Sequence, residues 1–403
     1  MNSKTRFVFA LIIVLAPLGY VRAQLPADLQ SDLGPDMPAF KVRPGYRVTR
    51  AVAPRALRES RFLQFSEDGK TLFVSDRENG AIYALRDPDA DGIYKTITTF
   101  VKDKRSVHGM DVHDGWLYFS QAAEGSISRA RDTNNDGVAD DVEVILPAKT
   151  LPTGGGHPFE GLLITDKEIY VTCSDPTNMT EEIDTARKTL YVFDLDGKNK
   201  RVFCTGIRNT EKLRFRPGTT DIYGFDHGSD NFGRTFGEQT GKVQPITDLN
   251  PPEELNKLVE GGFYGHPFIM GNGVPRPEFS KRSDIVELAT KTIQPEWLVH
   301  AHWAVLGFTF INGDYFPGQK GDIYFCSHGS WNSVKPVGAV VQRVMFDQVT
   351  GKPCGSMTIV DCQGPQRRLS RPVDIAEAPD GTLIFSSDEP AGLFRISKST
   401  KSN

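Results

Sequence analysis

A histidine and an aspartate bracket one predicted hairpin, and their spacing is the first feature that could do chemistry. His157 follows three glycines in GGGHPFEGLLITDKEIYVTCSD, and Asp175 ends the same stretch. An imidazole titrates near neutral pH and can accept a proton from a hydroxyl, while a carboxylate can hold the ring in one tautomer. The pair is therefore a candidate acid–base site, and the alternative is a polar surface histidine in a loop.

Other polar side chains that could act with this histidine fall in loops that follow predicted strands. The mostly cationic group comprises His157, Asp175, Arg208, Asn209, Asp226, His227, His328, Lys335 and Arg371. A guanidinium pairs with a carboxylate through two parallel hydrogen bonds, so this group favours a ligand with several carboxylates. Arg208 and Asn209 could instead cap a hairpin. We expect structural or surface roles for His108, His113, His266 and His300.

Two acidic loops could bind Ca²⁺. DTNNDGVADDVE has the ligand spacing of an EF-hand loop, with Asp132, Asn134, Asp136, Gly137, Asp140 and Glu143. Strands rather than helices are predicted on both sides, so the ion would hold a loop within a sheet. The second loop, DPDADG, lacks an acid at the twelfth position. The alternative for both is an Asx-rich hairpin turn.

The elements that must position these residues recur along the chain. Each copy has an Asx-Gly or Gly turn, an apolar strand, a polar gap and a second strand, as in DGKTLFVSDRENGAIYALRD and DGTLIFSSDEPAGLFRIS. Alternating β-branched and aromatic residues around such turns predict antiparallel hairpins. Six copies at a spacing of about 50 residues predict an all-β, six-bladed β-propeller, one four-stranded blade for each copy.

Two segments depart from the repeat. The gap between the fourth and fifth copies is about twice the period, which predicts a top-face insertion between blades four and five. This insertion contains PPEELNKLVEGGFYGHPF, expected as a loop or short helix. The early strand GYRVTRAVA is expected to close the ring by completing the last blade.

The ends and the composition complete the domain prediction. We expect a signal peptide at 1–23, an N-terminal extension at 24–39, the propeller at 40–398 and a tail at 399–403. A periplasmic or secreted protein follows, without a further apolar run that could span a membrane. A formal net charge of −4 gives no reason to expect nucleic acid. In such a compartment Cys354 and Cys362 could close a hairpin disulfide.

Six stretches resemble the quinoprotein sugar dehydrogenases, which include soluble glucose dehydrogenase, L-sorbosone dehydrogenase-like proteins and fungal pyranose dehydrogenases. They are the His157 stretch, GIRNTEKLRFRPGTTDIYGFDHGSDNFG, NPPEELNKLVEGGFYGHPF, AHWAVLGFTF, HGSWNSVKPVG and SRPVDIAEAPDGTLIFSSD. The resemblance implies a six-bladed propeller that carries pyrroloquinoline quinone (PQQ) and Ca²⁺ on its top face. It also implies a small-molecule sugar substrate. Without a haem domain in the chain, a separate electron acceptor, a cytochrome or a quinone, would be required.

The resemblance also implies roles for four residues at the reacting centre. His157 looks like the general base, and Asp175 looks like the carboxylate that orients it. Arg208 and Asn209 look like the pair at the reactive carbonyl of the quinone, where Arg208 and Ca²⁺ would polarise the hydride acceptor.

Further residues look like cofactor ligands in this resemblance. The backbone carbonyls of Gly228 and Ser229 look like ligands of the catalytic Ca²⁺, and Lys335, Arg371 and Arg368 look like partners of the cofactor carboxylates. Two positions depart from the family pattern, because Ser229 and Ser333 stand where many relatives have arginine.

The sequence thus predicts a secreted quinoprotein oxidoreductase that moves a hydride from a sugar hydroxyl, of an aldose, pyranose or sorbosone-like sugar, to PQQ with the help of Ca²⁺. The alternative is a non-catalytic secreted propeller that binds carbohydrate or protein on a degenerate cofactor site. A metal-dependent lactonase would need inward-facing Glu, Asn and Asp ligands that the predicted blade ends do not supply.

Overall fold

The computed structural model describes residues 32–157, 161–181, 186–232 and 246–400. These residues belong to one compact unit, Ser31–Asn403. The predicted signal peptide and the first part of the predicted extension lie outside the described residues. Within the described part of the chain, no helix has the length and apolar character needed to cross a bilayer.

Six sheets of four or five strands make up most of the described structure. The first sheet consists of β3 (Leu63–Phe65), β4 (Leu72–Asp76), β5 (Ala81–Pro88) and β6 (Tyr94–Val101). The second consists of β7 (Val107–His113), β8 (Trp116–Gln121), β9 (Ser126–Arg131) and β10 (Asp141–Leu146). The third consists of β11 (Leu162–Ile164), β12 (Glu168–Cys173), β13 (Thr189–Asp194) and β14 (Arg201–Thr205), extended by β18 (Gly262–Phe263).

The remaining three sheets follow the same order. The fourth consists of β15 (Thr210–Phe215), β16 (Ile222–Asp226), β17 (Glu253–Leu258) and β21 (Trp297–Val299). The fifth consists of β22 (Val305–Phe310), β23 (Ile323–Ser327), β24 (Val340–Phe346) and β25 (Pro353–Asp361), extended by β1 (Lys41–Val42). The sixth consists of β26 (Pro372–Glu377), β27 (Leu383–Asp388), β28 (Ala391–Lys398) and β2 (Tyr46–Arg50).

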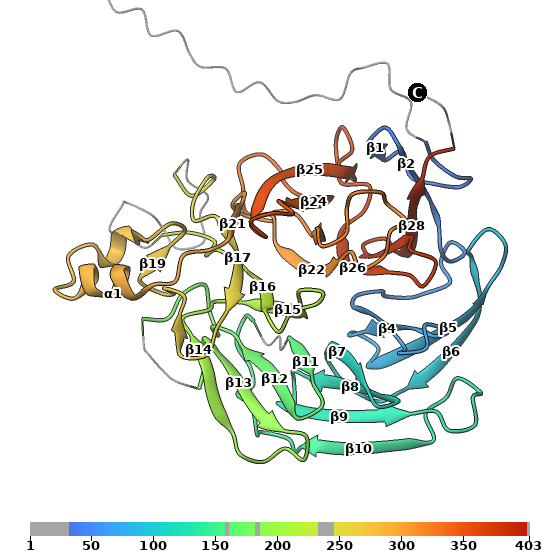
Figure 1. Ribbon diagram of the computed structural model, residues 1–403, viewed down its shortest axis with the longest axis horizontal. Coiled ribbons are helices and arrows are strands. Elements are labelled where there is room, and N and C mark those ends of the chain that lie inside the picture. Colours follow the sequence, from blue (N-terminus) through green and yellow to red (C-terminus); the bar gives the residue numbers. More distant parts are fainter. Residues whose placement is uncertain (1–31, 158–160, 182–185, 233–245, 401–403) are drawn as a thin grey trace, which may run out of the picture. The chain divides into compact units, whose positions relative to one another are not determined.

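The first strand of each sheet forms the inner wall of a ring. These strands contact one another in a closed cycle, β3–β7–β11–β15–β22–β26–β3, and the sheets follow one another in chain order in Figure 1. A buried apolar cluster fills each junction between neighbouring sheets. The second strands are accordingly buried on both faces, as β4 is along its whole length. The predicted all-β six-bladed propeller is confirmed.

The ring is closed by an early strand, as the sequence predicts. β2, which lies in GYRVTRAVA, pairs antiparallel with β28 from Tyr46–Lys398 to Arg50–Phe394. The last sheet therefore contains strands from both ends of the propeller, and separating them would expose the paired backbone groups of both strands.

The insertion lies within the fourth sheet, rather than between the fourth and fifth sheets as the sequence suggested. It runs from the end of β17 to β21 and contains β18, the hairpin β19 (Ile269–Met270) and β20 (Val274–Pro275), the 3₁₀ helix η2 (Pro277–Phe279) and α1 (Ile285–Lys291). We call residues 259–296 the insertion segment. Part of the stretch predicted as loop or helix is strand β17, which pairs antiparallel with β16 from Glu254–Asp226 to Leu258–Ile222. The Glu253 carboxylate at its start accepts hydrogen bonds from the backbone amides of Ala304 and Val305.

The structure does not contain the predicted disulfide, since Cys354 and Cys362 are both free. Cys354 lies on β25 and Cys362 directly follows it. Eight residues along one extended strand span about 27 Å, far beyond the roughly 7 Å that a disulfide can bridge. The short stretch between the two cysteines is one strand and not a hairpin.

The antiparallel order of each sheet divides the loops between two ends of the propeller. Loops that join successive sheets, or the second strand to the third, share one end; examples are residues 147–157 and 174–181. We call this end the top face. Loops that join the first strand to the second, or the third to the fourth, share the opposite end, which includes residues 132–140.

Candidate active site

Two glycines bring His157 against the loop that follows β12. Gly154 and Gly155 have φ angles of 80° and 86°, which side-chain-bearing residues rarely adopt. A Cβ on Gly155 would lie 2.6 Å from backbone atoms of Pro176, and the next amide, of Gly156, donates to the Pro176 carbonyl at 2.5 Å. The glycines therefore allow a close approach of two backbone segments, and His157 follows at once.

The His157 ring is held in one tautomer, in which Nδ1 is protonated and Nε2 is not. Nδ1 lies 2.8 Å from the backbone carbonyl of Asp175, which can only accept, so Nδ1 carries the proton. Nε2 lies 3.3 Å from Nη2 of Arg208, which can only donate. Burial, and then the charge of Arg208, lower the pKa of His157 to about 4. At neutral pH the ring is therefore a neutral hydrogen-bond acceptor.

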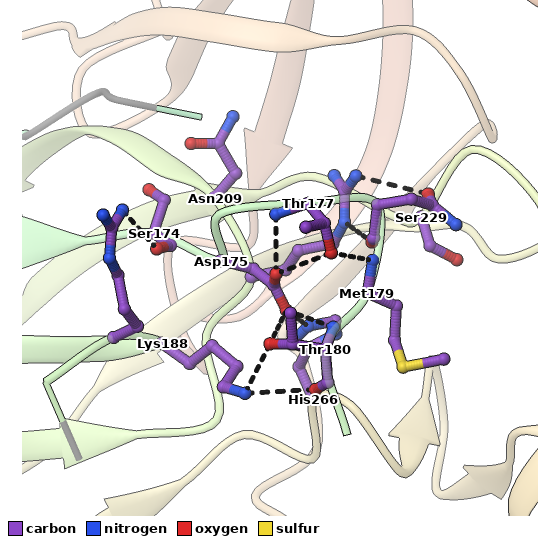
Figure 2. A network of polar contacts seen from close by, with 12 residues as sticks. Ser174, Asp175, Thr177, Met179, Thr180, Lys188, Asn209, Ser229 and His266 are labelled. Carbon is purple, nitrogen blue, oxygen red and sulfur yellow. Dashed lines mark hydrogen bonds and ion pairs between the residues drawn. The ribbon is translucent and has the colours of Figure 1, made fainter. Parts of the chain in front are cut away.

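The carboxylate of Asp175 does not hold His157, contrary to the sequence prediction. It accepts from Nε2 of His266 at 2.8 Å and from the amides of Thr177 and Thr180 at 2.9 and 3.0 Å (Figure 2). Burial would raise the pKa of Asp175, but the hydrogen bond from His266 and these amides outweighs burial and holds that pKa well below its usual value. Asp175 thus orients His157 through its main chain and remains ionised.

Arg208 and Asn209 directly precede β15, and a buried carboxylate holds their backbone. Asp226, which ends β16, accepts from the amides of Arg208 and Asn209 at 2.8 and 2.7 Å and from the Thr210 hydroxyl at 3.0 Å. The amide of Asp175 donates to the Arg208 carbonyl at 2.8 Å. The backbone position of Arg208 is therefore fixed from two sides.

The Arg208 guanidinium is buried, with an exposed fraction of only 3% for the residue. Nε donates to the Asn178 carbonyl at 2.8 Å, and the carboxylate of Asp230 lies 3.7 Å from Nη2. Asn209 donates through Nδ2 to His227 at 3.1 Å and to Glu211 at 3.0 Å. Its buried Oδ1 has no hydrogen-bond partner among the described residues.

The loop after β16 carries the two backbone carbonyls that were predicted to bind Ca²⁺. A Cβ on Gly228 would lie 2.7 and 2.8 Å from the carbonyl oxygens of Pro251 and Pro252, so only glycine fits there. Ser229 is buried, and its hydroxyl accepts from Nη1 of Arg276. Main-chain oxygens therefore gather around Gly228, and oxygen is the donor that Ca²⁺ prefers.

A cavity of about 20 Å³, large enough for a water molecule, separates this loop from the insertion segment. Its lining includes Arg208, Gly228, Glu254, His266 and Arg276. Burial, and then the neighbouring Asp226 carboxylate, raise the pKa of Glu254 to about 8. Glu254 is therefore largely protonated at neutral pH and does not cancel the charge of the Arg208 guanidinium, which also lines the cavity.

A second basic cluster lies on the same face around His328. Nη2 of Arg371 donates to Nδ1 of His328 at 2.9 Å, and Nε2 of His328 donates to Asp388 at 3.0 Å. The Nε atoms of Arg368 and Arg371 are buried without a hydrogen-bond partner in the described part of the chain. Lys335, also predicted to hold the cofactor, is exposed.

These observations bear on whether an anionic cofactor fits. The two buried Nε–H donors of Arg368 and Arg371, which have no acceptor among the described residues, and the buried Arg208 suit a ligand with several carboxylates. The oxygen-rich loop at Gly228 suits a hard cation. The residues present therefore fit PQQ and Ca²⁺, with the arginines and not Ser229 or Ser333 providing the charge.

The predicted EF-hand-like loop lies on the opposite end of the propeller from these residues. Asp132 accepts from the amides of Asn135 and Gly137 at 2.6 and 2.7 Å, and Asp140 accepts from the Thr133 amide at 2.6 Å. Glu143 pairs with Arg129 on the neighbouring strand. The remaining ligands of the prediction, Asn134 and Asp136, accept from backbone amides within the loop.

An arginine side chain donates hydrogen bonds to two backbone carbonyl oxygens of this loop. Arg86 donates to the Asn135 carbonyl at 2.9 Å and to the Asp136 carbonyl at 2.5 Å. No group of three or more His, Cys, Asp or Glu residues suited to a metal occurs in the described part of the chain. In this structure the loop is an Asx-rich turn closed by a guanidinium, and its binding of Ca²⁺ stays a prediction. In the second loop Asp89 likewise accepts from the amides of Asp91 and Ile93.

Comparison with known proteins identifies the family. Residues 40–399 match the TrAA12-like family. The chain belongs to that family. The resemblance to quinoprotein sugar dehydrogenases drawn from the sequence is confirmed at this level.

The TrAA12-like chain is similar in fold to several solved structures. It superimposes on the holo form of the PQQ domain of pyranose dehydrogenase from Coprinopsis cinerea with a TM-score of 0.75 and 20% identity, covering 91% of this chain and 98% of that one. For a calcium structure of a family AA12 carbohydrate-active enzyme from Trichoderma reesei, the TM-score is 0.73 and the identity 19%, over 92% and 99% of the two chains. An uncharacterized protein of Borreliella burgdorferi is 27% identical over 370 residues, 89% of this chain and 90% of that protein.

Several residues of the TrAA12-like site were not found by sequence reasoning. His266 was expected to be structural or at the surface, yet it contacts the carboxylate of Asp175, 91 positions away. Asn178 and Asp230 hold Arg208, and Arg276 holds Ser229. Asn178 and Asp230 stand beside predicted loop residues and could have been found by position. No local signal marks Arg276, which stands between two prolines in VPRPEF.

Proposed function

We propose that this protein is a quinoprotein oxidoreductase that oxidises a hydroxyl group of a sugar with PQQ as the hydride acceptor. One observation carries the proposal: a neutral histidine presents an unprotonated Nε2 to a buried guanidinium, on the face that also holds two arginine Nε–H groups without an acceptor among the described residues. This arrangement combines a base with charge that suits a polycarboxylate.

His157 would act on the proton of the sugar hydroxyl. Its Nδ1–H donates to the Asp175 carbonyl, so the unprotonated Nε2 lies on the other side of the ring and faces Arg208. A pKa of about 4 makes the free ring a weak base. A bound anion that pairs with Arg208 would weaken the repulsion between Arg208 and a protonated ring. The pKa of His157 would then rise toward the working pH, which strengthens the base where it is needed.

The chain supplies residues that would hold each part of the cofactor. Arg208 and Asn209 would contact the reactive end, Arg371 and Arg368 the carboxylates, and the Gly228 and Ser229 carbonyls the Ca²⁺. Bound PQQ with Ca²⁺ would supply a hydride acceptor whose carbonyl is polarised by the cation. The buried position of Arg208 shields its guanidinium from bulk solvent, so its electrostatic effect on that carbonyl is stronger than at a surface.

Three further features belong to this proposal. The substrate is an aldose, a pyranose or a sorbosone-like sugar; the similarity to a pyranose dehydrogenase supports a sugar of this class. Electrons leave to a separate cytochrome or quinone. The protein works in the periplasm or outside the cell, as the apolar N-terminal segment of the sequence suggests.

The test is dye-linked oxidation of a panel of aldoses and ketoses after incubation with PQQ and Ca²⁺, with cofactor binding followed by absorbance. His157→Ala should bind PQQ nearly as well as wild type, while turnover falls roughly 10²–10⁴-fold, the usual contribution of a positioned base. His113→Ala, at the opposite end of the propeller, is the control. Wild type that binds no PQQ, or a fully active His157→Ala variant, would refute the proposal and favour a non-catalytic binding propeller.

A further inference from the structure

The insertion segment reaches the candidate site at two separate points. We propose that it positions the site, with His266 holding the half that contains His157 and Arg276 holding the half that contains Ser229. Both are positioning residues, because each acts through another residue. The effects on turnover rest on the proposed function, whereas the effects on apo-protein geometry do not.

The route of the segment explains how it reaches the top face. β17 ends at the opposite end of the propeller, and β18 then pairs in parallel with β14, the outer strand of the third sheet. β14 runs toward the top face, so β18 carries the chain in the same direction. Backbone bonds then fix the arrival point, as the amide of Tyr264 donates to Thr205 and that of His266 to Gly206, both at 2.9 Å.

His266 completes the set of donors around Asp175. The residue is 9% exposed, and burial lowers its pKa to about 4 although the Asp175 carboxylate opposes this shift. The ring is therefore neutral, and its Nε2–H donates to the carboxylate at 2.8 Å. Asp175 in turn contacts His157 through its carbonyl and Arg208 through its amide. Any rotation of the Asp175 side chain and backbone would thus shift both residues at the reacting centre.

Arg276 performs the corresponding task for the loop of Ser229. Its guanidinium is 2% exposed and donates to the Ser229 hydroxyl and, at 3.3 Å, to the Asn231 carbonyl. The charge is matched by Glu278 at 2.6 Å, and the group lies over the Phe232 ring at 5.2 Å from its centroid. A neutralised, stacked guanidinium fixes a loop more than it attracts a ligand. Arg276 therefore sets the position of the carbonyls at 228 and 229.

The two contacts predict two separable defects. Removing His266 should disturb the tautomer of His157 and reduce turnover, with little effect on cofactor affinity. Removing Arg276 should loosen residues 228–232 and weaken the retention of Ca²⁺ and PQQ, with little effect on His157. A merely structural insertion would instead produce the same general loss in both variants.

The His266 contact is tested with His266→Ala and His266→Gln, since glutamine can still donate to Asp175. In the protein without added cofactor, ¹⁵N NMR of histidine side chains should show Nδ1–H for His157 in wild type and in His266→Gln, and a mixture of tautomers in His266→Ala. Turnover of loaded His266→Ala should fall roughly tenfold, as for other residues that orient a catalytic group. An unchanged His157 tautomer in His266→Ala would overturn this half.

The Arg276 contact is tested with Arg276→Met, which keeps the length of the side chain but removes the donors. Hydrogen exchange of residues 228–232, again without cofactor, should become faster, and the dissociation constant for PQQ with Ca²⁺ should rise roughly tenfold. Lys291→Gln, an exposed change on α1 of the same segment, is the matched control. Unchanged exchange in Arg276→Met, or equal defects in both assays for both variants, would overturn the proposal. Wild type that neither binds PQQ nor oxidises sugar would refute the proposed function, while the NMR and exchange results would still decide this inference.

Discussion

Acidification should destabilise the protein through His157, and the size of the effect follows from its surroundings. The ring has a pKa of about 4 in the folded protein, against 6.5 ordinarily. The unfolded chain therefore binds a proton first as the pH falls, and stability that is present above about pH 6.5 is lost toward pH 4. At about pH 5 the difference is 1.5 pH units, or about 2 kcal/mol from this residue alone.

Replacing the ring isolates this contribution. His157→Gln removes the titrating group but keeps a polar side chain of similar length. The groups that face the ring, Arg208, His227 and Asp230, remain in place. Between about pH 7 and pH 5 wild type should lose about 2 kcal/mol more than the variant. Arg208→Met should recover part of this difference, because the repulsion from the guanidinium disappears.

Equilibrium urea unfolding followed by tryptophan fluorescence measures the difference, with the denaturant slope compared at each pH. His113→Gln, at the opposite end of the propeller, controls for the loss of any histidine. If wild type and His157→Gln lose stability in parallel, the ring is not the half-buried neutral acceptor described above, and the basis for its role as a base disappears.

Three further predictions concern other parts of the structure. Asp132→Ala should cost about 0.5–1.5 kcal/mol, because the amides of Asn135 and Gly137 lose their acceptor. Excess chelator should shift the melting temperature of wild type and variant by the same amount, since any Ca²⁺ at Gly228 is common to both; a chelator effect that is smaller in the variant would restore the Ca²⁺ interpretation of the Asp132 loop. Cys354 alone should react with a thiol reagent in the folded protein, since the other described cysteines are buried; a change in labelling after reduction would contradict this. Wild type should lose stability as the pH rises from about 4.5 through about 8, because Glu254 has a raised pKa in the folded protein and its ionised form is disfavoured there. Glu254→Gln cannot ionise and should not show this loss. This loss is about 3 kcal/mol at pH 7, and equal pH profiles would refute it.

The blades were predictable from the sequence because each is a local unit. Alternating apolar residues and tight turns specify hairpins within about 50 residues, and repetition of the unit specifies the ring. The fourth blade was harder to read, because Glu253 and Asn256 make β17 look like a loop. Their burial depends on partners from elsewhere, such as the Ala304 and Val305 amides for Glu253. Local polarity cannot show a tertiary partner of this kind.

The sequence predicted which residues form the candidate site better than it predicted the contacts between them. The loops at His157, Asp175 and Arg208 do meet, because strand parity places them all on the top face. The hydrogen-bond partners of these side chains were not predictable, because backbone atoms and side chains distant in the sequence can form the same hydrogen bonds. His157 donates to the backbone carbonyl of Asp175 and not, as was predicted, to its carboxylate. The carboxylate instead accepts a hydrogen bond from His266.

The closure of the ring by β2 has a consequence for the order in which the protein is made. β2 emerges from the ribosome early, but its partner β28 follows only after roughly 350 residues. At about 5–20 residues per second, this strand waits some tens of seconds with an unpaired edge. Blades one to five can form hairpins as they appear, whereas the last sheet must wait for translation to end. Errors of assembly should therefore concentrate in the sixth blade, where an orphan strand is exposed to other chains.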